Sequence, residues 1–372
     1  MSEKDFHLKA LVRQIFWNEG LSTRLNVKLS ALIPRNTSKT RAPIEEYTDL
    51  DVLGIVFTPD FRLRLKIADC KTSPKRIPER LFWLEGVRHF FKADECYLVR
   101  PHDVTSSSRQ LAARLGISLI CGKDFQVLMQ IAANESKTTS DSPFLDGSLY
   151  QAREQILSSL EEKLDPLQKY RLTYYWLLEP RRNLQQLISF LGDFQPHLRA
   201  DSKTHLILFS DYVWLYTLTV LQTVEYVVAT GISDINRSIR QYLFGGELGL
   251  RERESLVKQL KELRYIIEGK QATSAKEIFR ILPPYYDGLL ELVTRFARKP
   301  KASTKALRYA EWLNLSEAFL TKSSDLPQEL IPIDEVSVKL LNDVAIFITE
   351  ASGLNKDFSS KYIELSNQVF AK

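Results

Sequence analysis

The sequence contains few of the residues that build disulfide frameworks. Cysteine occurs three times in 372 residues, and no two cysteines form a C-x-x-C pair. A sparse, odd number of cysteines, without a signal peptide at Met1–Ala10, argues for a reducing cytoplasm and against disulfides. Residues 149–372 also contain no metal-ligand spacing, no glycine-rich phosphate loop and no histidine cluster. We therefore expect a cytoplasmic protein in which Cys70, Cys96 and Cys121 are small buried hydrophobic residues.

The sequence also lacks an uninterrupted apolar run suited to a membrane. Its most apolar stretch, Leu206–Val228, contains Asp211 and Glu225. Neither carboxylate would be stable in lipid, because a charged side chain there is costly. We therefore expect a buried core helix at this stretch, and no membrane partner is predicted.

The composition that remains is that of an ordinary globular protein, with 44% hydrophobic and 26% charged residues. A length of 372 residues exceeds the usual size of one domain and favours two. Residues 1–132 hold 21 Lys and Arg against 15 Asp and Glu, whereas the remainder holds 30 against 31. The basic excess therefore lies in the N-terminal third, which suits a polyanionic partner.

The most informative stretch is Asp49–Lys71, whose pattern predicts a β-hairpin. Two runs rich in Val, Ile, Leu and Phe flank a Thr58-Pro59-Asp60 turn signal. Side chains alternate between the two faces of a strand, so a turn centred on Asp60 fixes the partners across the hairpin. The predicted pairs are Phe57–Leu63, Ile55–Leu65, Leu53–Ile67, Asp51–Asp69 and Asp49–Lys71.

This register places two carboxylates opposite each other at the end of an apolar stripe. Like charges at directly opposed strand positions are destabilising, so Asp51 and Asp69 require an explanation. A cation such as Mg²⁺, which takes one or two carboxylates, would supply it. Lys71 would then lie beside the metal as a point charge for an anionic oxygen. The alternative is that these residues are strand-end charges in water.

The elements predicted around the hairpin form a mixed α/β arrangement. Apolar spacing predicts a helix over residues 3–19 and a strand over 24–33, followed by a polar, basic loop at 34–46. Two β-α-β steps after the hairpin imply parallel strands. The helices and strands predicted there cover residues 78–91, 96–99, 106–115, 117–120 and 124–133, with Ser106 to Ser108 as the cap of the second helix.

Residues 134–148 are polar, show little apolar periodicity and are the predicted linker. They separate an α/β domain at 1–133 from residues 149–372, where only helices are predicted. Examples of these helices are 150–164, 168–178, 205–229, 251–267, 275–280 and 336–350. The sequence of this half does not indicate its role. Its aromatic residues are expected in the core, for example Tyr174, Tyr175, Trp176, Trp214 and Tyr216.

An α-β-β-β-α-β core with an Asp, and a D-x-K about twenty residues later, resembles the PD-(D/E)xK nuclease superfamily, also called the restriction-endonuclease-like fold. The matching residues are Asp51 in T-D-L-D-V-L-G, and Asp69 and Lys71 in I-A-D-C-K-T-S. The chain is most similar to the archaeal Holliday-junction-resolvase and Mrr-like branches, over residues 3–133. It departs from the family at Leu50, which replaces the eponymous Pro, and Asp69 stands where Glu is commoner. The resemblance implies a mixed-sheet restriction-endonuclease-like domain followed by an all-α domain.

The resemblance also implies the composition of a metal site. Asp51, Asp69 and the main-chain carbonyl of Cys70 would bind Mg²⁺, with Mn²⁺ as a substitute. Many family members add an acidic residue from the first helix, and the expected strand directions favour Glu3 or Asp5 for that role. The bound metal would lower the pKa of a water molecule and stabilise charge at the scissile phosphate.

Basic residues receive roles from the same resemblance. Lys71 would orient the attacking hydroxide or neutralise charge in the transition state. The helix after the hairpin would present its N-terminus to DNA phosphates. The candidate nucleic-acid-binding residues are Ser73, Lys75, Arg76, Arg80 and, in the basic loop before the hairpin, Arg41. The alternative for these residues is a solvated surface.

The resemblance implies a Mg²⁺-dependent endonuclease that hydrolyses DNA, in anti-phage restriction or in repair. The helical half would supply target choice, oligomerisation or regulation, through a second copy or a protein partner. One alternative is a non-catalytic nucleic-acid-binding or assembly protein that keeps a nuclease-like fold. Another is an unrelated α/β protein whose hairpin charges are incidental. The presence of all three motif residues favours catalysis, since a decayed site usually loses one.

Overall fold

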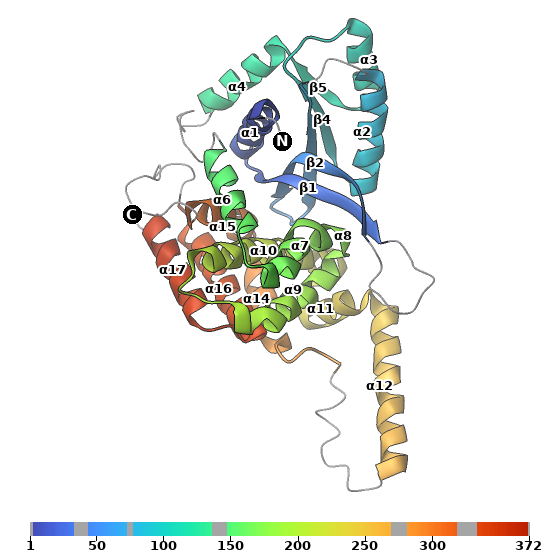
Figure 1. Ribbon diagram of the computed structural model, residues 1–372. Coiled ribbons are helices and arrows are strands. Elements are labelled where there is room, and N and C mark those ends of the chain that lie inside the picture. Colours follow the sequence, from blue (N-terminus) through green and yellow to red (C-terminus); the bar gives the residue numbers. More distant parts are fainter. Residues whose placement is uncertain are drawn as a thin grey trace.

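The N-terminal part of the chain forms a five-stranded mixed sheet with helices, and the remainder is largely helical (Figure 1). The computed structural model describes residues 3–32, 44–72, 77–135, 147–268, 281–317 and 333–370. The predicted α/β class of the N-terminal part and the helical character of the rest are therefore confirmed.

The strands lie across the sheet in the order in which they occur in the chain. The first three pair antiparallel and the last three pair parallel. This change of direction follows from the connections, because a tight turn joins antiparallel strands and a helix joins parallel ones. The strands are β1 (Ser22–Leu32), β2 (Ile44–Phe57), β3 (Leu63–Cys70), β4 (Glu95–Arg100) and β5 (Ser118–Cys121).

The hairpin of β2 and β3 has the register that its sequence predicts. Phe57 pairs with Leu63, Ile55 with Leu65 and Leu53 with Ile67. The Thr58 N–H donates to the Arg62 carbonyl oxygen at 3.0 Å and closes the turn. The left-handed backbone of Phe61, at φ 63°, completes the reversal.

Two layers of helix cover the sheet (Figure 1). The helices α1 (Glu3–Asn18) and α4 (Lys123–Glu135) lie on one face, and α2 (Ile77–Phe91) and α3 (Ser106–Leu115) lie on the other. The approach of α1 to β2 is close. A Cβ atom on Gly54 would lie 2.7 Å from Leu21 Cδ2 and 2.9 Å from Phe16 Cδ2. A side chain at this point of β2 would force Leu21 or Phe16 to shift.

Two boundaries predicted for this region are wrong. The cap of α3 is Thr105, whose extended backbone lets its hydroxyl accept from the Ser108 N–H. The serines that were expected to cap the helix lie inside it. The strand β2 begins at Ile44, so residues 44–46 belong to the sheet rather than to the predicted loop.

The helical half contains α6 (Ser148–Ser158), α7 (Asp165–Lys169), α8 (Tyr175–Leu177), α9 (Pro180–Phe194), α10 (Lys203–Thr230), α11 (Ile235–Phe244), α12 (Glu247–Glu268), α14 (Tyr286–Ala297), α15 (Pro300–Glu317), α16 (Glu335–Ser352) and α17 (Asp357–Phe370). A π-helical turn at Tyr170–Tyr174 joins α7 to α8. The helix predicted at 275–280 lies outside the described residues.

The predicted helix over residues 150–164 is too long. Helix α6 ends at Ser158, where the Ser158 and Ser159 hydroxyls donate to the carbonyl oxygens of Gln155 and Ile156, each at 2.7 Å. Serine side chains that bond to nearby carbonyls compete with continuation of a helix.

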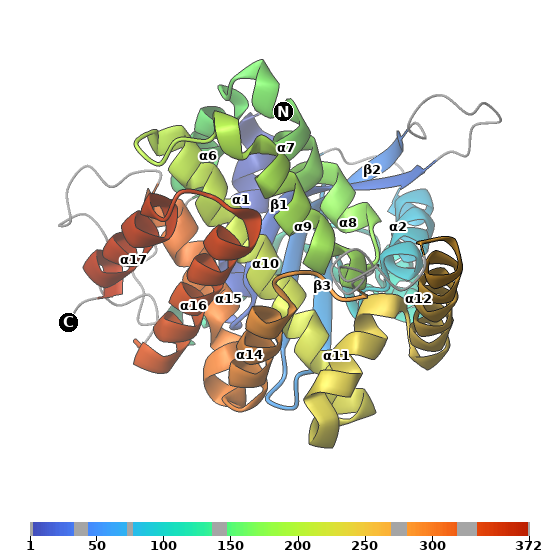
Figure 2. The ribbon, with the colours of Figure 1, turned by 90° about the horizontal axis from the view of Figure 1, so that it is seen from below.

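The long apolar stretch forms α10, which is the central helix of this half (Figure 2). Among the described residues, α10 is the one helix long and apolar enough to cross a membrane, and 94% of its most apolar window is buried inside the protein. Of the aromatic residues expected in the core, Tyr175, Trp214 and Tyr216 are buried, whereas Tyr174 and Trp176 are partly buried and pack against the core. The stretch is thus a core helix, as Asp211 and Glu225 indicated.

A buried carboxylate on α15 joins the helical half to α1 and β1. Glu311 accepts hydrogen bonds from Arg13 Nη2 at 2.9 Å, from Ser22 Oγ at 2.8 Å and from the Thr23 N–H at 2.6 Å. The hydroxyl of Thr23 also donates to it. We call these residues the Glu311 cluster.

A second buried carboxylate joins α10 to β1. Asp211 is fully buried, with Arg24 Nη1 at 2.6 Å, Arg171 Nη1 at 3.2 Å and Arg153 Nη1 at 3.7 Å. Burial alone would raise the pKa of Asp211, but the three arginines outweigh it and hold that pKa below its ordinary value. This Asp211 cluster and the Glu311 cluster fix the first strand of the sheet to the helices.

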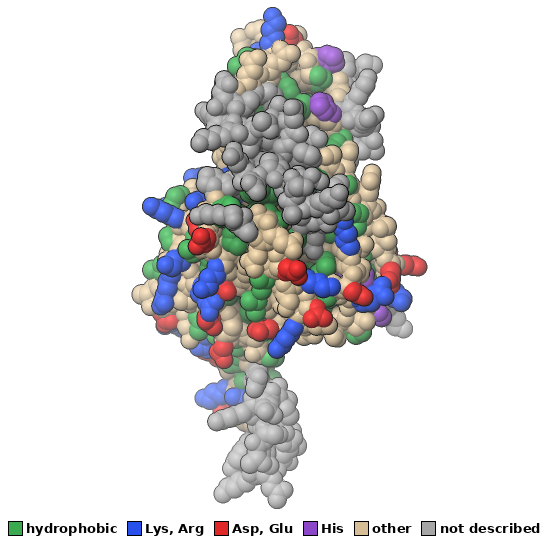
Figure 3. Space-filling model, turned by 90° about the vertical axis from the view of Figure 1, so that its left-hand side faces the viewer, with side chains coloured by type: hydrophobic (Ala, Val, Ile, Leu, Met, Phe, Trp, Pro, Cys, Tyr) green, Lys and Arg blue, Asp and Glu red, His purple; other side chains and the backbone are tan. Residues whose placement is uncertain are grey.

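The outer surface of the helical half carries charges of both signs. On the face shown in Figure 3, Lys and Arg side chains are interspersed with Asp and Glu side chains over this half. Among the described residues of that face, no extended patch of one sign is visible. The near-neutral charge of residues 133–372 is therefore also evenly distributed there.

Candidate active site

The two aspartates of the hairpin converge on one lysine. Asp51 of β2 is 2% exposed and Asp69 of β3 is 4% exposed. The ammonium nitrogen of Lys71 lies 3.3 Å from Asp51 Oδ2 and 3.4 Å from Asp69 Oδ1. The three residues of the D…D-x-K motif therefore form one compact group at the end of the hairpin.

One detail of the predicted register is wrong. The pairing of β2 with β3 ends at Val52 and Ala68, short of the predicted pairs Asp51–Asp69 and Asp49–Lys71. The Lys71 N–H instead donates to the carbonyl of Val99 in β4, at 3.0 Å. Asp49 lies 3.9 Å from Lys9, which also contacts Asp51. Beyond β3, the backbone of Lys71 is therefore hydrogen-bonded to the parallel strand β4. Its side chain reaches both Asp51 and Asp69.

Cys70 contributes its backbone to the site. Its N–H donates to Asp51 Oδ2 at 2.7 Å, which holds that carboxylate toward β3. Complete burial raises the pKa of the Cys70 thiol, and the nearby carboxylates raise it further. The thiol is therefore not a nucleophile at neutral pH. All three cysteines are free and buried, as predicted.

The first helix supplies a cation to the site. Lys9 Nζ lies 2.6 Å from Asp51 Oδ1 and donates to Asn26 Oδ1 at 2.6 Å. Asn26 lies opposite Asp51 in the register of β1 and β2 and has a left-handed backbone, with φ at 56°. A non-glycine residue in that conformation is uncommon and often marks a functional site.

A third basic group comes from α2. The Arg80 guanidinium donates to both oxygens of Asp69, from Nε to Oδ2 at 2.6 Å and from Nη2 to Oδ1 at 2.5 Å. It is stacked on the Trp83 ring, with 3.5 Å from Cζ to the ring centroid. Such two-point bonding is the strongest form of carboxylate recognition by arginine.

The site is rich in positive charge. Lys9, Lys71 and Arg80 surround the two carboxylates of Asp51 and Asp69. Burial disfavours the charged form of Lys71, but Asp69 and Asp51 outweigh it and raise the pKa of Lys71 above its ordinary value. Lys71 is therefore a fixed cation at neutral pH and not a proton acceptor.

The donor set fits a hard divalent cation. Within the described part of the chain, no group of three or more His, Cys, Asp or Glu gathers as a metal site. A structural zinc site would need four such ligands, whereas Mg²⁺ takes one or two carboxylates and completes its shell with water and phosphate oxygens. The Lys71 ammonium shows that the point between Asp51 and Asp69 accepts positive charge. A metal there would compete with Lys71 and with Arg80 for the carboxylate oxygens.

Several predicted site residues cannot be placed. The side chains of Glu3 and Asp5 lie outside the described residues, as do Ser73, Lys75, Arg76 and Arg41. Arg80 is described, and it contacts Asp69 rather than standing apart as a surface cation.

Sequence reasoning missed Lys9, Asn26 and Arg100. Lys9 carries the clearest signal, because it interrupts the apolar stretch of α1 and is 4% exposed. Arg100 ends the buried strand β4 and is also 4% exposed. A charged residue at a buried position of an apolar element is the feature that could have identified both.

Cavities lie beside the site and away from it. One of about 690 Å³ is lined by Thr72, the residue after Lys71, and by His7, His102 and Phe125. It lies at the same edge of the sheet as the aspartates and is large enough for a nucleotide-sized group.

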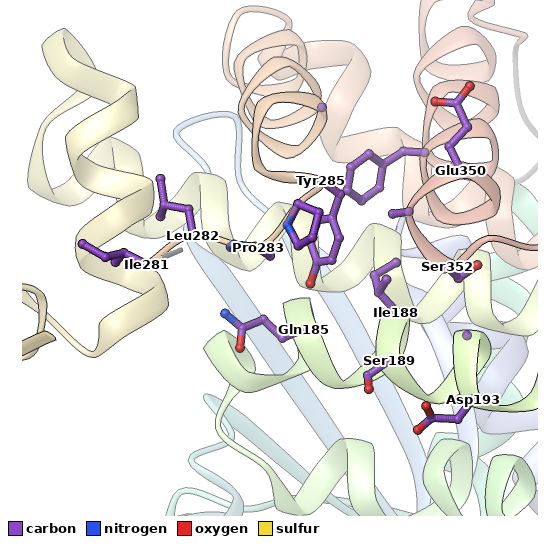
Figure 4. Close-up of a pocket in the computed structure, with 15 residues that line it drawn as sticks. Gln185, Ile188, Ser189, Asp193, Ile281, Leu282, Pro283, Tyr285, Glu350 and Ser352 are labelled. Carbon is purple, nitrogen blue, oxygen red and sulfur yellow. The ribbon is translucent and has the colours of Figure 1, made fainter. Parts of the chain in front are cut away.

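Another cavity, of about 970 Å³, lies in the helical half (Figure 4). Helix α9 supplies Gln185 and Asp193, α16 supplies Glu350, and Tyr285 lies between them. No residue of the aspartate site lines this cavity, so it is separate from the hairpin chemistry.

Comparison with known proteins gives no match: no family model, no curated protein and no solved structure matches the chain. Functional inference therefore depends on the geometry of the site.

Proposed function

We propose that the protein is a metal-dependent endonuclease of the PD-(D/E)xK type that hydrolyses DNA phosphodiester bonds with Mg²⁺ or Mn²⁺. The supporting observation is the position of Lys71, whose ammonium lies 3.3 and 3.4 Å from the carboxylates of Asp51 and Asp69. Two buried carboxylates supply oxygens for a metal that activates water, and a lysine beside them supplies a positive charge for the phosphate. The basic excess of residues 1–132 supports DNA as the substrate.

Each residue of the site has a role in this proposal. Asp51, Asp69 and the Cys70 carbonyl would hold the metal, which when bound supplies a water of lowered pKa and positive charge at the phosphate. Lys71 stays protonated and neutralises charge on a non-bridging phosphate oxygen. The Cys70 N–H and Lys9 keep Asp51 in place. Arg80 would leave Asp69 when the metal binds.

The proposal extends to the cellular role. A cytoplasmic nuclease with a large helical half suits restriction-like defence or repair, with the helical half as the part that selects the target or contacts a second copy or a protein partner. The mixed charge of that half on the face in Figure 3 gives no support to DNA contact there.

The test is cleavage of supercoiled plasmid with Mg²⁺ or Mn²⁺ by the full chain. We expect Asp69→Ala and Lys71→Ala to lower the rate at least ~100-fold, since each removes a group that acts on the developing charge. Asp60→Ala, in the exposed hairpin turn, is the matched control and should cleave as the wild type does. Equal rates in all variants, or no cleavage by the wild type, would contradict the proposal.

One observation favours a second candidate, a nucleic-acid-binding protein without catalysis. Every oxygen of Asp51 and Asp69 already contacts a protein N–H or ammonium group, from Lys9, Cys70, Lys71 or Arg80. A site so satisfied is complete without a metal. In that case DNA binding would be unchanged by EDTA, and Asp69→Ala would alter stability but no catalytic rate.

A further inference from the structure

Arg100 is a buried cation whose partners do not account for its charge. It is the last residue of β4 and is 4% exposed. Its Nη1 atom is buried and has no hydrogen-bond partner among the described residues. A buried charge without a full set of partners is costly, so such a residue in a folded protein calls for a specific role.

The sheet places Arg100 beside the aspartate site. In the parallel register Asp69 pairs with Leu98, and the Lys71 N–H donates to Val99, the residue before Arg100. Because side chains alternate along a strand, Asp69, Lys71 and Arg100 lie on one face of the sheet. Arg80 reaches the same face from α2 through its bonds to Asp69.

No described carboxylate at this face is left to neutralise Arg100. Asp69 attracts it, but both oxygens of Asp69 are held by Arg80, and Arg80 repels it. The next residue across the sheet is Cys121, which pairs with Arg100 in the register of β4 and β5. Burial raises the pKa of the Cys121 thiol, so it is neutral at pH 7 and supplies no anion.

An acceptor for Nη1 would come from outside the described side chains, and an anion would both accept the bond and balance the charge. Lys71, Arg80 and Arg100 are three cations on one face, and the cluster meets solvent at Lys71 and Arg80, whereas Arg100 Nη1 is buried. Guanidinium groups match the oxygens of a phosphate in a planar, two-point arrangement. A phosphate group therefore suits these three cations, which would repel a metal ion.

We propose that Lys71, Arg80 and Arg100 form a binding site for one phosphate group, with Arg100 as its buried anchor. The site deepens the proposed function, and its ligand rests on that function: the bound group is a backbone phosphate of the DNA substrate at the scissile position. Free inorganic phosphate has the same chemistry and would compete for the site.

The test measures binding without catalysis. Full-length protein in EDTA is titrated with a fluorescein-labelled DNA oligonucleotide by anisotropy, at several salt concentrations, and with inorganic phosphate as competitor. We expect Arg100→Gln to weaken DNA binding about tenfold, to lower the salt slope by about one and to abolish competition by phosphate. Arg100→Lys keeps the charge but loses the two-point fork, and should weaken binding less.

The matched control is Arg114→Gln, an exposed arginine on α3, which should bind within about twofold of the wild type. Urea denaturation separates binding from folding. Because removal of an unpaired buried charge relieves a cost, we expect the Arg100→Gln midpoint to equal or exceed that of the wild type. A lower midpoint with unchanged binding would mean that Arg100 is structural and would overturn the proposal.

Two further outcomes are informative. Wild-type binding of DNA and phosphate that Arg100→Gln and Arg100→Lys leave unchanged would also overturn the phosphate site, whatever the plasmid assay shows. If plasmid is never cleaved while binding depends on Arg100, the endonuclease proposal fails and the phosphate site stands. The two proposals therefore fail separately.

Discussion

Arg80 holds both carboxylate oxygens of Asp69, at 2.6 and 2.5 Å, from the first turn of the helix that follows the hairpin. A guanidinium in this position occupies the oxygens that a divalent metal would use. The same residue is stacked on Trp83, so its position is fixed from both sides. A metal that binds Asp69 would therefore compete with a cation that belongs to the protein.

The first prediction concerns that competition. Arg80→Ala removes a charge-assisted pair of hydrogen bonds of about 1.5–3 kcal/mol, so Mn²⁺ should bind at least ~10-fold more tightly to the variant. The measurement is Mn²⁺ titration followed by electron paramagnetic resonance. Arg88→Ala, on the same helix and paired with Glu85, is the control. Equal affinity in both variants would show that Arg80 does not restrain the metal site.

The second prediction concerns the contact between β2 and α1. In Gly54→Ala the new Cβ would lie 2.7 Å from Leu21 and 2.9 Å from Phe16, both of them buried. Overpacking of a core typically costs about 1–3 kcal/mol, and we expect that loss in urea denaturation. Gly86→Ala on α2, where a Cβ meets nothing within 4 Å, should be neutral or stabilising. A Gly54→Ala variant as stable as the wild type would mean that α1 moves away from β2 without cost.

The third prediction concerns the Asp211 cluster. Asp211→Ala leaves Arg24, Arg153 and Arg171 without their shared carboxylate in the interior. Removal of one partner from a buried ionic group typically costs about 3–5 kcal/mol, which should appear as a lower free energy of unfolding. Glu291→Ala, which breaks an exposed pair with Arg295, should change stability little. A small effect of Asp211→Ala would show that the arginines find other partners.

The fourth prediction concerns pH. Burial raises the pKa of Glu225, whose carboxylate accepts from the Leu63 N–H at 2.9 Å and ties β3 to α10. The folded state then holds this proton more tightly than the unfolded state does. Stability from this residue is therefore present below pH about 4.5 and declines as pH rises through the raised pKa.

Glu225→Gln keeps the acceptor and removes the charge, so it should abolish that decline and be at least as stable as the wild type at pH 7. Urea midpoints measured between pH 4 and 8 provide the test. Glu262→Gln on α12, which is exposed, should follow the wild-type curve. A Glu225→Gln curve that also follows the wild type would contradict the assignment.

The hairpin was predictable because its information is local. Alternating apolar residues on both sides of a Thr-Pro-Asp turn determine the register, and the register brings Asp51 to Asp69. Lys9 and Arg100 could not be placed in this way. Their roles depend on how α1 and β4 pack against the hairpin, and neither residue has a sequence neighbour that encodes the contact. The left-handed backbone of Asn26, between the pairs Leu25–Val52 and Val27–Leu50, is likewise a feature that local spacing does not predict.

The helical half was predictable in class but not in detail. Apolar spacing predicts α10 and α16. It does not predict the end of α6, where the Ser158 and Ser159 hydroxyls donate to carbonyl groups of the last turn. Local spacing could not predict the partners of Arg13 and Arg24, because Glu311 and Asp211 lie far from them in the sequence. Buried ionic clusters between distant segments depend on the tertiary fold and not on local preference.

The Glu311 cluster has a consequence for biosynthesis. Arg13 and Glu311 lie 298 residues apart, and a ribosome that adds about 5–20 residues per second needs about 15–60 s to travel between them. During that interval the first helix and strand lack the carboxylate that Arg13, Ser22 and Thr23 share in the folded chain. The Glu311 cluster can therefore form only after residue 311 has been synthesised. A chain that ends before residue 311 would lack this link between β1 and α15.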